Sequence, residues 1–277
     1  MSAKKILRRA GSVLLIVIIG LHTGCTSGYK AGWYRIFAER GDAKAQNNLG
    51  ICYRDGIGVS QNYTEAARWF RLSAEQGYAE AQYNLGVSYQ TGTGVPQIWS
   101  EAAKWYRRSA EQGNAEAQYN LGRCYLAGFG VPQDYLSAKK WILLSAEQGN
   151  AIAQNDMGSI YRYSIGELQD YSKALEWYKR SAKQNCPEAQ HNIGTCYMEG
   201  VGVEQDFSEM VKWFKLSAQQ GYVLSQFNLG VCYQNGTGVS QDMTEAEKWF
   251  RLAAEQGFKA AKKRLETDFR ESESLQN

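Results

Sequence analysis

The sequence contains few histidines and few prolines. Its only two histidines, His22 and His191, exclude a histidine-rich metal centre and an H-E-x-x-H motif. Three prolines in 277 residues, with 44% hydrophobic and 13% aromatic residues, argue against intrinsic disorder. We therefore expect a folded chain without a metal or a cofactor, and we expect His191 to lie on the surface.

No charge of one sign dominates the chain. The formal net charge is +3, but Lys4, Lys5, Arg8 and Arg9 stand at the N-terminus, and without them 27 basic residues face 28 acidic ones. The remaining basic residues are spread along the chain and form no stripe that would follow phosphates. We expect no nucleic-acid partner.

A long hydrophobic run is confined to the N-terminus. The basic stretch from Lys4 to Arg9 precedes the apolar run Val13–Leu21. Such a run fits the h-region of an export signal, which has about 7–15 apolar residues. It is short for a bilayer span, which needs about 20. Residues 1–25 are therefore predicted to be a signal peptide.

The end of this segment resembles a bacterial lipoprotein signal, in which a small residue precedes a cysteine that is lipidated. Gly24 and Cys25 fit the pattern, whereas His22 stands where leucine is usual. The resemblance implies several acyl chains on Cys25 and firm anchoring in the cell envelope. Because Thr26 is not the aspartate of inner-membrane retention, it implies the outer membrane, with the chain facing the periplasm or the cell surface. Ordinary cleavage nearby and an uncleaved anchor are the alternatives.

Glycine and tryptophan recur with a period of 36 residues, without insertions or deletions. This regularity predicts an all-α fold, an α/α superhelical solenoid of stacked helix-turn-helix units similar to tetratricopeptide repeats. Residues 26–41 are a linker with a partial repeat, 42–257 hold six full units, and 258–277 form a capping helix and tail. The recurring positions are Gly41, Gly77, Gly113, Gly149, Gly221 and Gly257, with Asn185 in the missing place, and Trp69, Trp105, Trp141, Trp177, Trp213 and Trp249.

Each unit predicts two helices joined by a glycine turn. In residues 42–77 the first helix covers about 43–54 and the second opens near Asn62, a predicted N-cap that Glu65 completes as a capping box. Gly50 lies inside the first helix at a cost of about 1 kcal/mol, which predicts a close helix approach beside the tryptophan of the second helix. Gly77 ends the unit, and Asn185 can replace it because asparagine tolerates the left-handed conformation.

Two regions depart from the pattern. In the fourth unit Ser164 and Glu167 replace a loop glycine and valine, so we expect an altered turn. Near the C-terminus Glu266 replaces the helix glycine beside Lys262 and Lys263, which suits a polar cap on the stack.

The repeated motifs A-x-A-Q-x-x-L-G-x-x-Y, G-x-G-V and A-x-x-W-[FY]-x-x-[SA]-A-x-Q-G resemble the Sel-1-like repeat family, most clearly at residues 81–113. The period differs from that of tetratricopeptide repeats, about 34 residues. The resemblance implies a right-handed superhelix and a non-enzymatic scaffold or adaptor with a protein or peptide partner. Exported bacterial members are similar to regulators of envelope signalling or to factors that meet host proteins.

The sequence offers little support for catalysis. Carboxylates such as Glu65, Glu209 and Glu245 recur with the repeat and fit helix caps better than an acid/base pair, so a hydrolase is the weakest alternative. Cysteines at one repeat position lie at least a helix packing distance apart, about 8–10 Å, whereas disulfides need Cα atoms within about 7 Å. We expect the thiols to be core residues; the four are Cys52, Cys124, Cys196 and Cys232.

Positions on the first helix opposite its apolar stripe vary between units. Exposed aromatic and arginine side chains are typical hot-spot residues of interfaces. We therefore expect Tyr83, Tyr119, Arg123 and Phe227 to contribute to a partner-binding groove on the concave face. The alternatives are that they pack against neighbouring units or are merely exposed.

Overall fold

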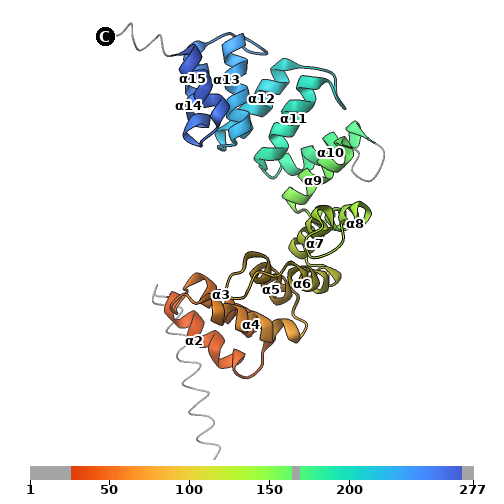
Figure 1. Cartoon of the computed structure of the whole chain (residues 1–277), viewed down its shortest axis with the longest axis vertical. Coiled ribbons are helices and arrows are strands. Elements are labelled where there is room, and N and C mark those ends of the chain that lie inside the picture. Colours follow the sequence, from red (N-terminus) through yellow and green to blue (C-terminus); the bar gives the residue numbers. More distant parts are fainter. Residues whose placement is uncertain (1–25, 164–168, 270–277) are drawn as a thin grey trace, which may run out of the picture. The chain divides into compact units, whose positions relative to one another are not determined.

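The computed structural model describes residues 26–163 and 169–269, and in this part of the chain every helix is an α-helix and there is no strand (Figure 1). The fold-class prediction is confirmed: two-helix repeats follow one another at the 36-residue step. The predicted signal peptide, Cys25 and the expected altered turn at Ser164 and Glu167 lie outside the described residues.

The chain divides into two compact units, residues 1–134 and 135–277. First helices of the repeats carry odd labels from α3 to α15, and second helices carry even labels. Unit 1 contains α2 (Thr26–Ala38), α3 (Ala43–Asp55), α4 (Tyr63–Glu75), α5 (Ala79–Thr91), α6 (Trp99–Glu111) and α7 (Ala115–Ala127). Unit 2 contains α8 (Tyr135–Glu147), α9 (Ala151–Arg162), α10 (Tyr171–Ala182), α11 (Pro187–Glu199), α12 (Phe207–Gln219), α13 (Val223–Asn235), α14 (Met243–Glu255) and α15 (Lys259–Asp268).

The second helices begin at the predicted N-caps, but without a capping box. The Asn62 side chain accepts a hydrogen bond from the Glu65 amide at 3.1 Å, as N-caps do. The Asn62 amide, which a capping box would give to Glu65, instead donates to the Tyr53 carbonyl at 2.9 Å. Glu65 pairs with Arg68 at 3.2 Å. The capping-box prediction is wrong because the turn returns the N-cap amide to the end of the first helix.

The helix glycines mark a close approach, as predicted, but the aromatic partner is not the tryptophan. A Cβ placed on Gly50 would lie 2.6 Å from the Phe70 ring, and one on Gly86 would lie 2.7 Å from the Tyr106 ring. Trp69 packs with small residues of α2 and with α3 of its own repeat. The glycine therefore receives the residue that follows the tryptophan.

Buried serine and glutamine side chains tie the helices together. Ser73 on α4 donates to the Ala43 carbonyl of α3 at 2.6 Å. Gln46, which is buried, donates to the Ala38 carbonyl of α2 at 3.1 Å and accepts from Gln76 at 2.6 Å. Because the same bonds recur at the repeat step, α3 and α5 are each held by the second helix before them and by the second helix after them.

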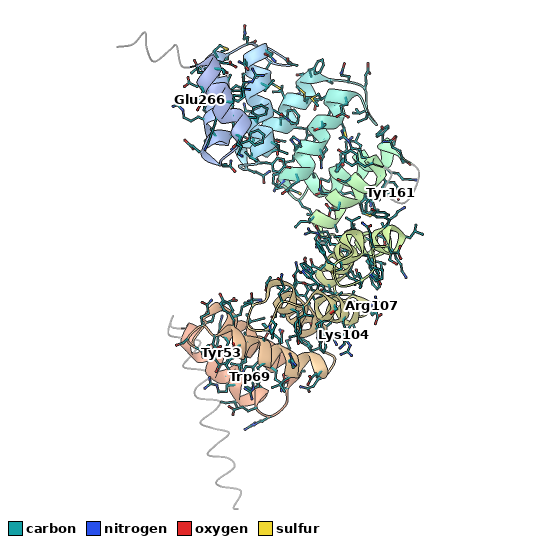
Figure 2. The ribbon with its side chains drawn as sticks, in the orientation of Figure 1. Tyr53, Trp69, Lys104, Arg107, Tyr161 and Glu266 are labelled. Carbon is teal, nitrogen blue, oxygen red and sulfur yellow. The ribbon has the colours of Figure 1, made fainter. Side chains whose placement is uncertain are left out.

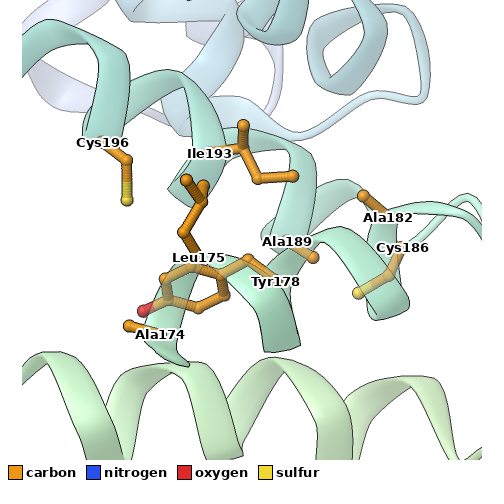
Figure 3. Close-up of a cluster of buried hydrophobic side chains, with 8 residues drawn as sticks. All are labelled: Ala174, Leu175, Tyr178, Ala182, Cys186, Ala189, Ile193 and Cys196. Atoms are coloured by element: carbon orange, nitrogen blue, oxygen red, sulfur yellow. The ribbon is translucent and has the colours of Figure 1, made fainter. Parts of the chain in front are cut away.

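The core of unit 2 shows how the cysteines are used. Tyr178 is fully buried between α10 and α11, and the thiols of Cys186 and Cys196 belong to the same apolar cluster (Figure 3). The five cysteines in the described residues are free and buried. Burial raises the pKa of Cys124 and Cys232 to about 11. These thiols therefore act as small apolar residues.

Helix α15 differs from the other first helices at one position. Glu266 on α15 (Figure 2) occupies the position that Gly230 has on α13. A Cβ on Gly230 would lie 2.8 Å from the Phe250 ring of α14, so Glu266 could not receive an aromatic ring in the same way. Phe269 instead packs on Phe250, with ring centroids 6.0 Å apart.

Candidate functional site

The first helices present one side to solvent, and we call it the first-helix face. It is described separately in each unit. In unit 1 it carries the half-exposed or exposed side chains Asn48, Ile51 and Asp55 of α3, Asn84, Val87 and Thr91 of α5, and Asn120, Arg123 and Ala127 of α7.

A hollow of about 370 Å³ opens on this face between α3, α4 and α5. Phe70 lies at its floor, and Arg54 and Asp55 form an ion pair of 2.7 Å at its rim. The hydrogen bond from Arg54 lowers the pKa of Asp55. The remaining lining residues are polar or small: Gln61, Tyr63, Ala66, Asn84, Val87, Ser88, Thr91 and Thr93.

The structure buries two of the four predicted partner residues more than we expected. Tyr119 is only 7% exposed. Tyr83 is half-buried: its ring lies 6.1 Å from that of Tyr106, and its hydroxyl is hydrogen-bonded to Asn120. Burial raises the pKa of Tyr83. The expectation of exposure is wrong for Tyr119, and Tyr83 is covered in part because its side of α5 faces Asn120 of the next repeat.

The other two predicted residues lie in different units. Phe227 in unit 2 is half-buried between Phe250 and Phe258, with centroid distances of 5.5 and 5.1 Å. Arg123 in unit 1 is exposed, with its guanidinium carbon 5.8 Å from the centroid of the Tyr119 ring. Of the four, Arg123 is exposed, Tyr83 and Phe227 are half-exposed, and Tyr119 is buried.

The first-helix positions that vary between repeats form hydrogen bonds with the next repeat. Asn84 donates its amide to the Asn47 oxygen at 2.9 Å, and Asn192 donates to Asn155 at the same distance. The Asn120 side chain likewise donates a hydrogen bond to the Tyr83 hydroxyl. The residue that changes from repeat to repeat is therefore held by an asparagine of the next repeat.

These asparagines form a row that our sequence analysis missed. They stand two residues before the helix glycine and are half-exposed on the first-helix face. The side-chain nitrogens of Asn84, Asn120 and Asn192 donate to the preceding repeat, and in the described residues no hydrogen bond is made to the side-chain oxygens of these three. The signal in the sequence was a position that is asparagine in all repeats but one, amid variable positions. The row is Asn48, Asn84 and Asn120 in unit 1 and Asn192 and Asn228 in unit 2, with Asp156 at the equivalent place.

His191 is not the surface residue that we expected. Its ring stacks on Phe214 with centroids 5.3 Å apart, and its Nδ1 pairs with the Ser225 hydroxyl at 2.8 Å. Burial, with the nearby charge of Arg162, lowers the pKa of His191 to about 4. The histidine is therefore a neutral packing residue between α11, α12 and α13 at neutral pH.

The predicted cap carboxylates stay at helix starts. Glu209 and Glu245 pair with Lys212 and Lys248 at 2.5 and 2.9 Å. In residues 26–163 and 169–269, no three or more histidine, cysteine, aspartate or glutamate side chains gather as a metal site would require. No helix of that part of the chain has both the length and the apolar character of a membrane span.

The repeats of this chain match a known protein family. The profile of the Sel1 repeat matches six consecutive segments, residues 43–78, 79–114, 115–150, 151–186, 187–222 and 223–258. A search of curated proteins gave no match.

Two solved structures are similar in sequence and fold. The first is a protective antigen of uropathogenic Escherichia coli strains with an SLR fold, at 40% identity and a TM-score of 0.79. That match covers 85% of this chain but 50% of the antigen, so this chain spans about half of its length. The second is a Sel1 repeat protein from Oxalobacter formigenes, at 31% identity and a TM-score of 0.73, covering 85% of this chain and 89% of that one.

Proteins built from this repeat are in general non-enzymatic scaffolds for protein interactions. The six matched segments coincide with the helix pairs from α3 to α14. The chain belongs to the Sel1 repeat family.

Proposed function

We propose that this protein is a non-enzymatic scaffold that binds an extended segment of a protein partner along the first-helix face. The observation that carries the proposal is the asparagine row. Asn84 and Asn120 each spend the side-chain nitrogen on the preceding repeat and leave the oxygen without a partner.

The chemistry of this row fits a polypeptide main chain. An amide oxygen is an acceptor with two lone pairs, and the backbone N–H groups of an extended segment are donors at regular intervals. Because the bond to the preceding repeat fixes each asparagine side chain, little rotamer entropy is lost on binding. Arg123 and the hollow beside Asp55 then supply contacts that depend on the side chains of the partner.

Affinity capture from the protein's own cell envelope tests the proposal. We compare the intact chain with a variant carrying Asn48→Ala, Asn84→Ala and Asn120→Ala. The control is Glu75→Gln, which changes an exposed residue on the second helix α4. The partner captured by the intact chain is expected to be lost with the asparagine variant and kept with the control, at unchanged helicity. Equal capture by all three chains contradicts the proposal.

We also propose that the protein is an envelope lipoprotein anchored through acyl chains on Cys25. The basic stretch, the apolar run and the Gly24-Cys25 ending support this location. Mass spectrometry of the native N-terminus is the test. An acylated N-terminal Cys25 is expected, and an unmodified or differently cleaved N-terminus contradicts it.

A second candidate is a factor that meets host proteins at the cell surface. The similarity to a protective antigen favours it over a regulator of envelope signalling, within the half of the antigen that the match covers. Antibody labelling of intact cells separates the two, because a surface factor is labelled and a regulator facing the periplasm is not.

A further inference from the structure

Helix α2 is a second helix without a first helix in the described residues. Among the helices of residues 26–163 and 169–269, α3 is the one that packs on α2. Trp33 lies one repeat before Trp69 in the 36-residue register, yet Trp33 is 36% exposed whereas Trp69 is 8% exposed. The side of α2 that the stack would normally bury is therefore open.

This open side is more apolar than the same side of other second helices. Phe37 stands where Ser73 and Ser109 are fully buried, and its ring lies 4.9 Å from that of Trp33. Ile36 on the adjoining side is 45% exposed. Trp33 and Phe37 also line a hollow of about 380 Å³ that reaches Lys44 and Asn48 of α3.

Helix α15, the last described helix, has a polar surface where α2 has an apolar one. Its exposed polar side chains are Lys259, Lys262, Lys263 and Glu266. Terminal repeats that face water need such a polar surface. The surface of α2 is therefore not built as a water-facing cap.

Cations flank the apolar side chains of α2. Lys30 and Arg40 are exposed, whereas Arg35 donates to the Tyr53 hydroxyl of α3. Glu39 is the acid beside Arg40, and Asp42 lines the hollow together with Lys44. Tryptophan beside lysine and arginine is the composition of segments that lie at the interface between lipid and water. Anionic headgroups complement the cations, and the acyl region accepts the indole ring and the Ile36 side chain.

We propose that the α2 surface, formed by Lys30, Trp33, Ile36, Phe37 and Arg40, lies against an anionic phospholipid bilayer. The inference rests on the proposed lipidation, since acyl chains on Cys25 place the bilayer at the residue before α2 begins. A second copy of the chain is the rival occupant. It is disfavoured because two such surfaces would bring like charges together.

Fluorescence quenching by brominated lipids tests the contact. The full chain, produced in its bacterial envelope, is incorporated into vesicles of equal parts phosphatidylglycerol and phosphatidylethanolamine with brominated acyl chains. The intact chain is compared with Trp33→Phe and with the matched control Trp99→Phe, which changes a half-exposed tryptophan on α6. Most of the quenched emission is expected to disappear with Trp33→Phe and to remain with Trp99→Phe.

A charge variant and sedimentation complete the design. Lys30→Gln with Arg40→Gln is expected to reduce the quenching on anionic vesicles, and phosphatidylcholine vesicles are expected to give less quenching for the intact chain. Equal quenching of the intact chain and Trp33→Phe overturns the inference. So does concentration-dependent dimerisation, seen by sedimentation, that Ile36→Ser abolishes.

The outcomes separate this inference from the proposed lipidation. An acylated chain that floats with the vesicles without quenching of Trp33 overturns the α2 contact and leaves the anchor in place. A chain without acyl groups that still shows quenching of Trp33 supports the α2 surface and removes the lipidation. If neither acylation nor quenching is found, both proposals fail.

Discussion

At the scale of single residues, the comparison of positions 36 residues apart predicted roles that the pattern of one helix does not indicate. Asn185 has φ of 61°, so it does adopt the left-handed conformation of the glycine it replaces. The helix glycines were identified as contact points, but their partners Phe70 and Tyr106 were not. A helical wheel orders residues around one axis, and the choice between adjacent aromatic residues depends on the angle at which the second helix crosses.

The glycine contact predicts a paired result for two alanine substitutions. With Gly86→Ala the new Cβ meets the fully buried Tyr106 ring at 2.7 Å, whereas Gly32 on α2 has no atom within 4 Å. Overpacking costs about 1–3 kcal/mol and the better helix propensity returns about 1. Gly86→Ala should therefore lower the free energy of unfolding by up to about 2 kcal/mol, and Gly32→Ala should raise it slightly. Urea unfolding followed by circular dichroism measures both, and equal midpoints for the two variants contradict the close approach.

The buried histidine predicts a dependence of stability on pH. The unfolded-state pKa of histidine is about 6.5. The pKa of His191 in the folded chain is lowered to about 4. Between these values the unfolded chain binds the proton and the folded chain does not, so stability is complete above about pH 6.5 and is lost as the pH falls toward 4.

The substitution His191→Phe removes this loss, since Phe227 already occupies the equivalent position in the next repeat. The intact chain should lose on the order of 2 kcal/mol more than the variant between neutral pH and about pH 4. Urea midpoints at both pH values give the comparison. Parallel losses in the two chains would show that the histidine is not held neutral.

At the scale of helices, the sequence predicted where elements begin and end, but not the contacts between repeats. The second helices start after Asn62, Asp170, Asp206 and Asp242, as their N-cap chemistry indicates. The misplacement of Tyr83 has a physical reason. Its helix α5 is covered on one side by α6 of its own repeat and on another side by Asn120 of the next repeat, and the periodicity of a single helix indicates only the side with the stronger apolar pattern.

The glutamine links between helices carry a prediction at this scale. Gln82 on α5 is 4% exposed, donates to the Ala74 carbonyl at 3.2 Å and accepts from Gln112 at 2.7 Å. Gln82→Leu removes both hydrogen bonds, although the Ala74 carbonyl keeps the Gly77 amide and the exposed Gln112 keeps the Arg108 carbonyl. The loss of two hydrogen bonds costs about 1–3 kcal/mol.

The control is Gln97→Leu, because Gln97 is exposed and donates one hydrogen bond, to the Gln90 carbonyl at 2.7 Å. It should change the free energy of unfolding by about 0.5 kcal/mol or less. Thermal and urea unfolding of both variants test the difference. A Gln82 variant as stable as the control would mean that water replaces the lost bonds.

At the scale of the whole molecule, stability follows from neighbour contacts repeated along each unit. The period, the six repeats and the polar last helix were all visible in the sequence, because they depend on identities that recur. The exposure of Trp33 on α2 was not, since it depends on which helices pack beside α2 in the folded chain. A chain of this kind is expected to respond to damage locally, because each repeat contacts only its neighbours.

Removal of residues 258–277 tests this locality. Phe258, Ala261 and Phe269 cover Phe250 and Ala253 of α14, so the truncated chain exposes that apolar face to water. Amide hydrogen exchange should accelerate in α13 and α14, which lose their outer neighbour, and stay unchanged in α3 and α4 of unit 1. The single substitution Phe269→Ala in the full chain should accelerate the same helices to a smaller degree. If exchange in α3 and α4 accelerates as much as in α14, the chain unfolds as one cooperative body, and the nearest-neighbour account of its stability is wrong.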